Sequence, residues 1–301
     1  MPVSDSDKLR IGYVPEHFST PLHFAQKHYG LDASLIPFPS GTGHMVESLK
    51  AKDIDIGMGL TEGWVAGLGK AGSPGPPFPF KIVGTYVSTP LSWAISTGKG
   101  RKGEFKAKLG GDESSALQGK KMGVSRIGSG SYVMGYVLAD TRGWLRHTTS
   151  PFEVIPADNF QGLRDAVNSG KADFFMWEHY TSNRYYEQGA IENIGWIDTP
   201  WSSWKIVAAD PEDWRLGDFA KRLNKGVEHF NQNGEEAVEY ISTQLDYSAA
   251  DARAWMKTVE FPTDVRKVDQ RVIRLTIDLL AKAGVIEKDR LIPADIIREI
   301  D

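Results

Sequence analysis

Hydroxyl and glycine residues gather in two short turns, and each turn separates a strand-like segment from a helix-like one. The members of the two turns are Ser40, Gly41 and Thr42, and Gly128, Ser129, Gly130 and Ser131. A helix N-terminus presents unpaired N–H groups and partial positive charge, and glycine lets a ligand approach the backbone. Either turn alone could be ordinary helix capping. The pair predicts a binding site for a polar or anionic small molecule.

Charged and aromatic side chains follow other strand-like segments. Glu16 and His17 come after one such segment, Glu62 after another, and Trp177 and Glu178 end a third. Ligands of open parallel sheets bind beyond the carboxyl ends of the strands. There the carboxylates would bind an amine or a ring N–H, and Trp177 would offer an aromatic wall. Solvated carboxylates and a packed tryptophan are the simpler alternatives.

Several catalytic and metal-binding patterns do not match the sequence. The turn from Gly128 continues to Val133 where a dinucleotide-binding motif has glycine, and Gly123–Ile127 ends in isoleucine where a serine-hydrolase elbow has glycine. The chain has no cysteine, and no two of its seven histidines have zinc-ligand spacing. We therefore expect no metal, no cofactor and no catalytic residue.

Length and composition are typical of a globular protein with a large core. The chain has 301 residues, of which 41% are hydrophobic, and a net charge of −4, which gives no basic surface for nucleic acid. No apolar run approaches the roughly 18 residues that suggest a membrane span. Met1–Lys8 lacks the pattern of a secretory signal. We expect a cytoplasmic monomer that binds neither nucleic acid nor a membrane.

A strand-turn-helix-strand pattern occurs twice, around residues 34–62 and 152–180. An offset of 118 residues places Asp55 on Asp173 and Met58 on Met176. Two such repeats predict two lobes that hold a ligand between them.

Strands and helices alternate through much of the remaining sequence. From Asp213 onward the pattern is helical, and one buried helix face is expected to contain Val268, Val272, Leu275 and Leu279. Glycine and proline predict loops at Gly72–Pro79 and Gly98–Gly119. The order of elements predicts an α/β fold with mostly parallel sheets and a helical C-terminal tail.

The chain resembles the type II periplasmic-binding-protein fold, in the superfamily of nitrate-, sulfonate- and taurine-binding and thiamine-pyrimidine-synthase-like proteins. The stretches that carry this resemblance are Arg10–Phe18, Pro39–His44, Asp53–Glu62 and Leu117–Ser131. Nearly the whole chain is covered, and the closest likeness is to a cytosolic fungal branch. The resemblance implies a discontinuous lobe of residues 1–92 plus 200–301, an inserted lobe of residues 93–199, and an interlobe cleft.

The resemblance also implies which residues contact the ligand, because the family's contacts come from strand-end loops. Carried over position by position, the set is Glu16, His17, Ser40, Gly41, Thr42, Thr61, Glu62, Gly128, Ser129, Gly130, Ser131 and Glu178. Related enzymes make a thiamine pyrimidine with a lysine after the third strand and a cysteine cluster. Here Met58–Glu62 contains no lysine and the chain contains no cysteine, which argues against that activity.

These observations predict non-catalytic binding of a small polar or anionic ligand, with hinge closure. In the narrower form of this hypothesis the ligand is aromatic and similar to a thiamine precursor. The alternative is a thiamine-precursor biosynthetic enzyme that acts on a pyrimidine or pyridoxal-type substrate and uses His17 or His179 as its acid–base group. Delivery of the ligand to a downstream enzyme or transporter is a third hypothesis.

Overall fold

The computed structural model describes residues 8–70, 75–105, 116–146, 148, 150–287 and 289–301. The chain divides into two compact units. Unit 1 comprises the described residues within Met1–Thr89, Trp201–Ala281 and Ile286–Asp301, and unit 2 those within Pro90–Pro200 and Lys282–Val285.

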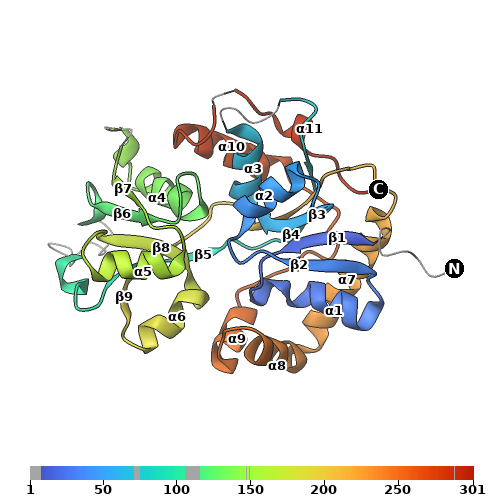
Figure 1. Cartoon of the computed structure of the whole chain (residues 1–301), viewed down its shortest axis with the longest axis horizontal. Helices are drawn as coiled ribbons and strands as arrows, with labels where there is room; N and C mark the ends of the chain where they lie inside the picture. Colours follow the sequence, from blue (N-terminus) through green and yellow to red (C-terminus); the bar gives the residue numbers. More distant parts are fainter. Residues whose placement is uncertain (1–7, 71–74, 106–115, 147, 149, 288) are drawn as a thin grey trace. The chain divides into compact units, whose positions relative to one another are not determined.

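Unit 1 is built on a five-stranded sheet with the order β2-β1-β3-β10-β4 (Figure 1). Its strands are β1 (Leu9–Tyr13), β2 (Ala33–Pro37), β3 (Ile56–Leu60), β4 (Lys81–Val87) and β10 (Trp204–Ala208). β1 pairs in parallel with β2 and β3, whereas β10 pairs antiparallel with β3 and β4. Four of the five strands therefore share one direction, and β10 enters from the C-terminal half of the chain.

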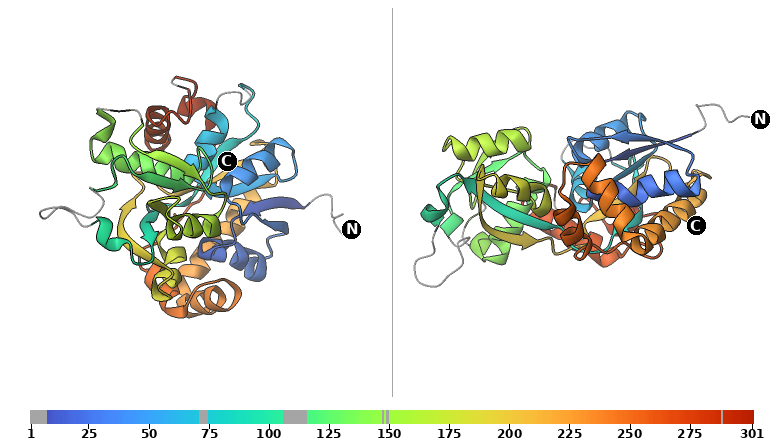
Figure 2. Two further views of the ribbon diagram at one scale, coloured as in Figure 1. Left: turned by 60° about the vertical axis from the view of Figure 1, so that its left-hand side comes forward. Right: turned by 90° about the horizontal axis from the view of Figure 1, so that it is seen from below.

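The helices of unit 1 come from both ends of the chain. They are η2 (His17–Ser19), α1 (Thr20–Tyr29), α2 (Thr42–Lys50), α3 (Thr61–Gly69), α7 (Leu216–Gln232), α8 (Gly234–Gln244), α9 (Ala249–Met256), α10 (Gln270–Lys282, whose last residue is assigned to unit 2) and α11 (Pro293–Ile296). α1 and α7 lie side by side (Figures 1 and 2). The predicted helical tail is thus confirmed, and it completes the core of the N-terminal sheet.

Unit 2 repeats the same plan with the strand order β7-β6-β8-β5-β9. Its elements are β5 (Ser92–Gly98), η3 (Lys102–Phe105), β6 (Lys121–Val124), α4 (Gly130–Thr141), η5 (Trp144–Arg146), β7 (Glu153–Pro156), α5 (Phe160–Asn168), β8 (Phe174–Glu178), α6 (His179–Glu187) and β9 (Ile191–Asp198). β6 pairs in parallel with β7 and β8, and β5 pairs antiparallel with β8 and β9.

The predicted internal repeat is confirmed at the level of single residues. Adding 118 to the bounds of α2 (42 and 50) gives those of α5 (160 and 168), and the same offset carries β3 onto β8 and α3 onto α6. The two sheets also place these strands at the same position in their order.

The superposition of Asp55 on Asp173 corresponds to one shared structural role. Asp55 accepts a hydrogen bond from the backbone N–H of Arg10 at 2.8 Å, and Asp173 accepts one from the backbone N–H of Lys121 at 2.9 Å. In return, each aspartate N–H donates to the carbonyl of the same partner residue. Both carboxylates therefore anchor the entry of a strand to its parallel neighbour, away from the strand ends where ligands bind.

The predicted apolar face of the C-terminal helix is wrong in register. α10 buries Ile273, Thr276, Ile277 and Leu280, whereas Leu275 is 40% exposed. Two series with spacings of three and four overlap in this segment, and local periodicity does not decide which one faces the core.

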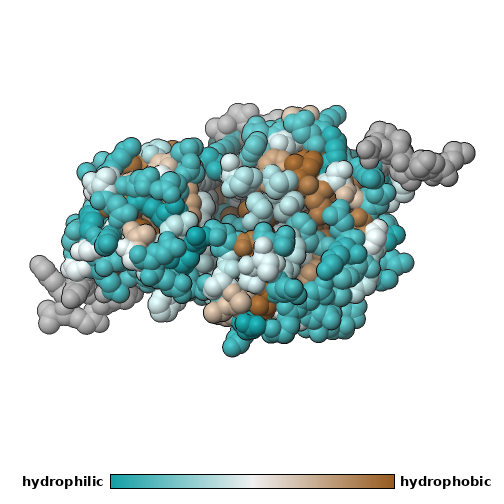
Figure 3. Space-filling model, turned by 60° about the horizontal axis from the view of Figure 1, so that its bottom comes forward, coloured by the Kyte–Doolittle hydropathy of each residue, from teal (hydrophilic) through white to brown (hydrophobic). Residues whose placement is uncertain are grey.

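The loops predicted at Gly72–Pro79 and Gly98–Gly119 fall partly outside the described residues. The described part of the second includes the short helix η3. Hydrophilic residues cover most of the face shown in Figure 3. Within the described residues, no helix is both long enough and apolar enough to cross a membrane.

Two extended segments connect the units in sequence, after β4 and after β9. Thr89 accepts hydrogen bonds from Ser203 N and Ser203 Oγ, at 3.0 and 2.9 Å. Leu91 and Thr199 exchange two more, each 3.0 Å long. The two crossings therefore run next to each other within each unit.

Candidate functional site

Parallel pairing brings the predicted site residues of each unit to one sheet edge. In unit 1, β1 lies between β2 and β3, so Glu16, Ser40 and Glu62 follow the carboxyl ends of neighbouring strands. In unit 2, β6 lies between β7 and β8, so the Gly128–Ser131 turn and Glu178 do the same. These edges are where parallel sheets bind ligands.

The Gly128–Ser131 turn contains a buried pair of hydroxyl groups. Ser129 and Ser131 are 3% and 2% exposed, and their Oγ atoms lie 2.9 Å apart. Ser129 Oγ also accepts from the N–H of Tyr132 as the N-cap of α4, and Ser131 Oγ accepts from the N–H of Ser125. A φ of 77° at Gly128 places the turn in the left-handed region that favours glycine.

Hydrogen-bond counting leaves one hydroxyl proton of this pair available. Whichever serine donates in the Ser129–Ser131 contact, the other hydroxyl keeps a proton with no acceptor in the described hydrogen bonds. The N–H groups of Gly130 and Ser131, at the first two positions of α4, likewise have no described acceptor. The turn therefore has donors that could serve an acceptor-rich or anionic group.

The Ser40–Gly41 turn of unit 1 is open. Ser40 is exposed, and Gly41, the N-cap of α2, has φ 75° and makes no side-chain cap. Space lies open around the position where a side chain at Gly41 would begin. The first N–H groups of α2 therefore lack the capping side chain that serine provides in α4.

Thr42 and Thr61 use their hydroxyls within unit 1. Thr42 Oγ1 accepts from the N–H of Leu60 at 2.9 Å. Thr61 is fully buried and its Oγ1 donates to the carbonyl of Ser202 at 2.6 Å. The two side chains tie the start of α2 to the end of β3, and the start of α3 to the segment before β10.

Glu62 is a buried carboxyl group at the start of α3. It is 1% exposed, and its Oε2 accepts a hydrogen bond from Trp201 Nε1 at 3.0 Å. Its Oε1 has no hydrogen-bond partner among the described residues. Burial raises the pKa of Glu62 to about 7, against the opposing effects of its backbone and Trp201 hydrogen bonds. The side chain can thus act as donor or acceptor near neutral pH.

Glu16 and His17 occupy different surroundings although they are adjacent. Glu16 is half-buried and precedes η2 as its N-cap. His17 is fully buried, and the rings of Tyr247 and Trp255 stack on its imidazole at 4.4 and 4.2 Å. Burial holds the pKa of His17 well below its usual value. The imidazole is therefore part of an aromatic stack in unit 1.

Trp177 and Glu178 both interact with helices of their own unit. The Trp177 ring stacks on Phe160 with centroids 5.0 Å apart and planes 9° apart. Glu178 is 6% exposed, and its carboxylate caps α6 by accepting from the N–H of Thr181 at 2.6 Å. Capping gives this buried carboxylate a structural role at the strand end.

Lys205 is a notable residue that pattern reasoning missed. It is fully buried on β10 opposite Gly59 of β3, and its Nζ donates to Ser202 Oγ. Burial lowers its pKa to about 7, although Asp269 opposes that shift. A single charged residue inside the apolar run Trp204–Ala208 was the available signal. Met58–Glu62 contains no lysine, but antiparallel pairing places Lys205 of β10 beside Gly59 of that strand.

The strands of the two α/β units are arranged in equivalent orders, and each unit has donor-rich turns at the carboxyl ends of its parallel strands. These features define a type II periplasmic-binding-protein fold. The chain belongs to the Ca3427-like family. The model of that family, "Ca3427-like PBP", matches residues 93–197. The structure of the Candida albicans CA3427 gene product, described as defining a new family with this generic fold, is 36% identical, with 98% of this chain and 97% of that chain covered and a TM-score of 0.82.

More distant structures share the fold. The alkanesulfonate-binding protein SsuA from Xanthomonas axonopodis pv. citri, bound to MOPS, is 14% identical over 98% of this chain and 99% of its own, with a TM-score of 0.73. PhnD1 from Prochlorococcus marinus, in complex with methylphosphonate, is 13% identical over 94% and 100%, with a TM-score of 0.56. The comparison with curated proteins gave no significant match.

Proposed function

We propose that this protein binds a small anionic or strongly polar ligand, without chemical conversion, in a cleft between its two units. In this proposal the units correspond to the lobes of residues 1–92 plus 200–301 and 93–199. The observation that carries the proposal is the Gly128–Ser131 turn, whose buried serine pair and uncapped N–H groups offer donors without described acceptors.

The relatives support an anionic ligand by their chemistry. MOPS carries a sulfonate and methylphosphonate a phosphonate, and these are the molecules bound by the Xanthomonas and Prochlorococcus proteins. Both groups present several acceptor oxygens, which match a helix N-terminus flanked by hydroxyls. A phosphorylated aminopyrimidine, the thiamine-precursor version of the proposal, has the same kind of group.

The predicted residues divide into two roles under this proposal. Direct ligand contacts are assigned to Glu16, Ser40, Gly41, Glu62, Gly128, Ser129, Gly130 and Ser131. Supporting roles are assigned to His17, Thr42, Thr61, Trp177 and Glu178, because each is held by stacking or hydrogen bonds within its own unit. Glu62 would recognise an amine or a ring N–H on the ligand body.

The test begins with native mass spectrometry of freshly purified protein, followed by calorimetric titration of any retained compound, methanesulfonate and methylphosphonate. The double variant Ser129→Ala, Ser131→Ala should weaken binding by about 1–3 kcal/mol, the scale of lost hydrogen bonds. Because Ser129 also caps α4, the variant should lose about 1 kcal/mol of folding stability as well.

The matched control is Ser248→Ala, which removes the serine cap of α9 in unit 1. It should cost similar stability and leave ligand affinity unchanged. If the serine double variant and the control bind the ligand with equal affinity, the Gly128–Ser131 turn serves only to cap α4 and does not contact the ligand.

Lys205 favours the enzymatic alternative, because a buried amine with a pKa of about 7 is partly neutral at physiological pH. Under the binding proposal, borohydride treatment with pyridoxal phosphate should leave no adduct on Lys205, and no pyrimidine product should form. An adduct that maps to Lys205 and is absent in Lys205→Met would contradict the binding proposal and support the enzymatic alternative.

A cytoplasmic location, a monomeric state and transfer of the ligand to a downstream enzyme or transporter remain parts of the proposal. Cell fractionation tests the location, analytical ultracentrifugation tests the monomeric state, and co-purification tests for a downstream partner.

A further inference from the structure

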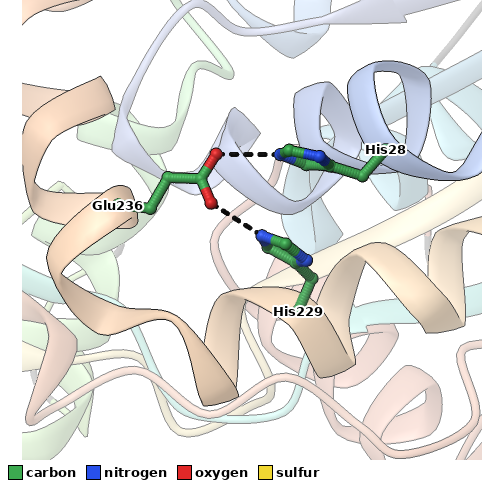
Figure 4. A group of neighbouring side chains, drawn as sticks. All are labelled: His28, His229 and Glu236. Carbon is green, nitrogen blue, oxygen red and sulfur yellow. Dashed lines mark hydrogen bonds and ion pairs between the residues drawn. The ribbon is translucent and has the colours of Figure 1, made fainter.

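Two histidines and a glutamate from three helices converge on the surface of unit 1 (Figure 4). His28 lies in the last turn of α1, His229 in the last turn of α7, and Glu236 in the first turn of α8. The Glu236 carboxylate bridges the two imidazoles, with Oε1 2.8 Å from His28 Nε2 and Oε2 2.8 Å from His229 Nε2. The three ligand atoms all lie within 4.8 Å of one another.

The imidazole rings are held in place by contacts outside this triad. The two rings stack on each other with centroids 4.3 Å apart and planes 15° apart. The Tyr29 hydroxyl lies 3.0 Å from His229 Nδ1, so that Nε2 is the nitrogen that faces Glu236. Outer hydrogen bonds of this kind orient histidines that bind metals.

The electrostatic surroundings favour a cation. α1 and α7 both end at this point, and helix C-termini carry partial negative charge. The Glu236 carboxylate accepts a hydrogen bond from Lys27 and lies within hydrogen-bond distance of both imidazoles. Lys27 Nζ lies 2.8 Å from Oε1, but its side chain is 64% exposed and can move into solvent when another cation arrives.

We propose that His28, His229 and Glu236 form a site for a divalent transition-metal ion of the Zn²⁺ type. Imidazole nitrogens suit Zn²⁺ and its neighbours, whereas Mg²⁺ and Ca²⁺ prefer oxygen ligands. Ligands about 2.0–2.1 Å from a tetrahedral ion are about 3.3 Å apart. The two 2.8 Å contacts of Glu236 therefore need to open by about 0.5 Å, and the stacked imidazole rings need to turn out of their near-parallel arrangement so that each Nε2 lone pair points at the ion. Water would fill the fourth position.

The site lies at the far end of α1 from the strand-end turns, since α1 begins after β1 and ends before β2. The ion would fasten α1, α7 and α8 to one another and so stabilise unit 1. The proposal is independent of the proposed ligand, and either can fail alone.

Calorimetric titration of chelator-treated full-length protein with Zn²⁺ alone, in a non-chelating buffer, tests the proposal. We expect one Zn²⁺ per chain and a rise in Tm of several degrees, because an ion that binds only the folded state stabilises it. His28→Gln, His229→Gln and Glu236→Gln should each weaken binding at least about tenfold. Mg²⁺ and Ca²⁺ should leave the Tm unchanged.

The matched control is His44→Gln, which removes an exposed histidine three residues before Glu47 on another helix of unit 1. It should bind Zn²⁺ as the wild type does. X-ray absorption at the zinc edge should show two imidazole ligands, and circular dichroism of the metal-free variants checks that they fold. Absence of Zn²⁺ binding, equal binding by His28→Gln, or equal loss in His44→Gln would overturn the assignment.

Discussion

Glu62 is 1% exposed, and only one of its two carboxyl oxygens has a hydrogen-bond partner among the described residues, namely the Trp201 indole. An ionised carboxylate in such a place is poorly solvated, so burial favours the protonated form. The pKa of about 7, compared with an ordinary value of 4.5, places its titration near neutral pH.

The raised pKa of Glu62 makes stability depend on pH. Between pH 4.5 and about 7 the folded state binds a proton that the unfolded state has released, so its stabilising effect is complete below 4.5 and lost as pH rises through 7. Glu62→Gln does not titrate, and its stability relative to the wild type should rise by about 2–3 kcal/mol between pH 4.5 and 8. Urea unfolding at several pH values measures this.

Lys205 also has a folded-state pKa of about 7, but its contribution to stability rises with pH, whereas that of Glu62 falls. Both proteins contain Lys205, so its contribution cancels when their stabilities are compared. Parallel stability curves for Glu62→Gln and the wild type would contradict the assigned pKa.

At the scale of elements, the shared anchoring by Asp55 and Asp173 has a measurable consequence. Burial alone would raise the pKa of Asp173, but hydrogen bonds from the N–H of Lys121 and from Arg101 hold it below the ordinary value. Asp173→Asn should therefore destabilise unit 2 by about 1–2 kcal/mol at pH 7. The loss should shrink as pH falls toward the pKa of the folded carboxyl, where the wild-type contribution is also lost.

Hydrogen exchange resolved by segment measures this loss in β6 and β8. Asp165→Asn, an exposed change on α5, serves as control and should have little effect. A loss spread evenly over both units would show that Asp173 does not act through the entry of β8.

At the scale of the whole molecule, the proposed binding mode predicts closure. The extended segments Ser88–Leu91 and Thr199–Ser203 are two of the places where the chain passes between the units, and hinge closure is expected to change the conformation of residues there. Small-angle scattering at saturating ligand should give a smaller radius of gyration than without ligand. The Ser129→Ala, Ser131→Ala variant at the same ligand concentration should stay nearer the unliganded value, and unchanged profiles for the wild type would count against closure.

The sequence by itself determined the repeated architecture. Turn residues and strand-helix alternation are local signals, so the predicted 118-residue offset is the one that relates α2 to α5, β3 to β8 and α3 to α6, although the exact bounds of these elements were not predicted. The same signals identified the hydroxyl turns, because the types and spacing of Ser129 and Ser131 are visible in one dimension. The register of the α10 face was not determined, since two equally spaced apolar series overlap there.

Only the tertiary structure decided which of these groups have donors to offer and which distant residues meet. Thr61 and Ser202 bond across 141 positions, and Glu62 and Trp201 across 139. Spacing rules for zinc ligands detect neighbours along the chain, whereas His28 and Glu236 lie 208 positions apart and meet only because α1 packs beside α7. Burial and partner choice depend on packing between segments, and those properties set the pKa of Glu62 and Lys205 and the use of each hydroxyl.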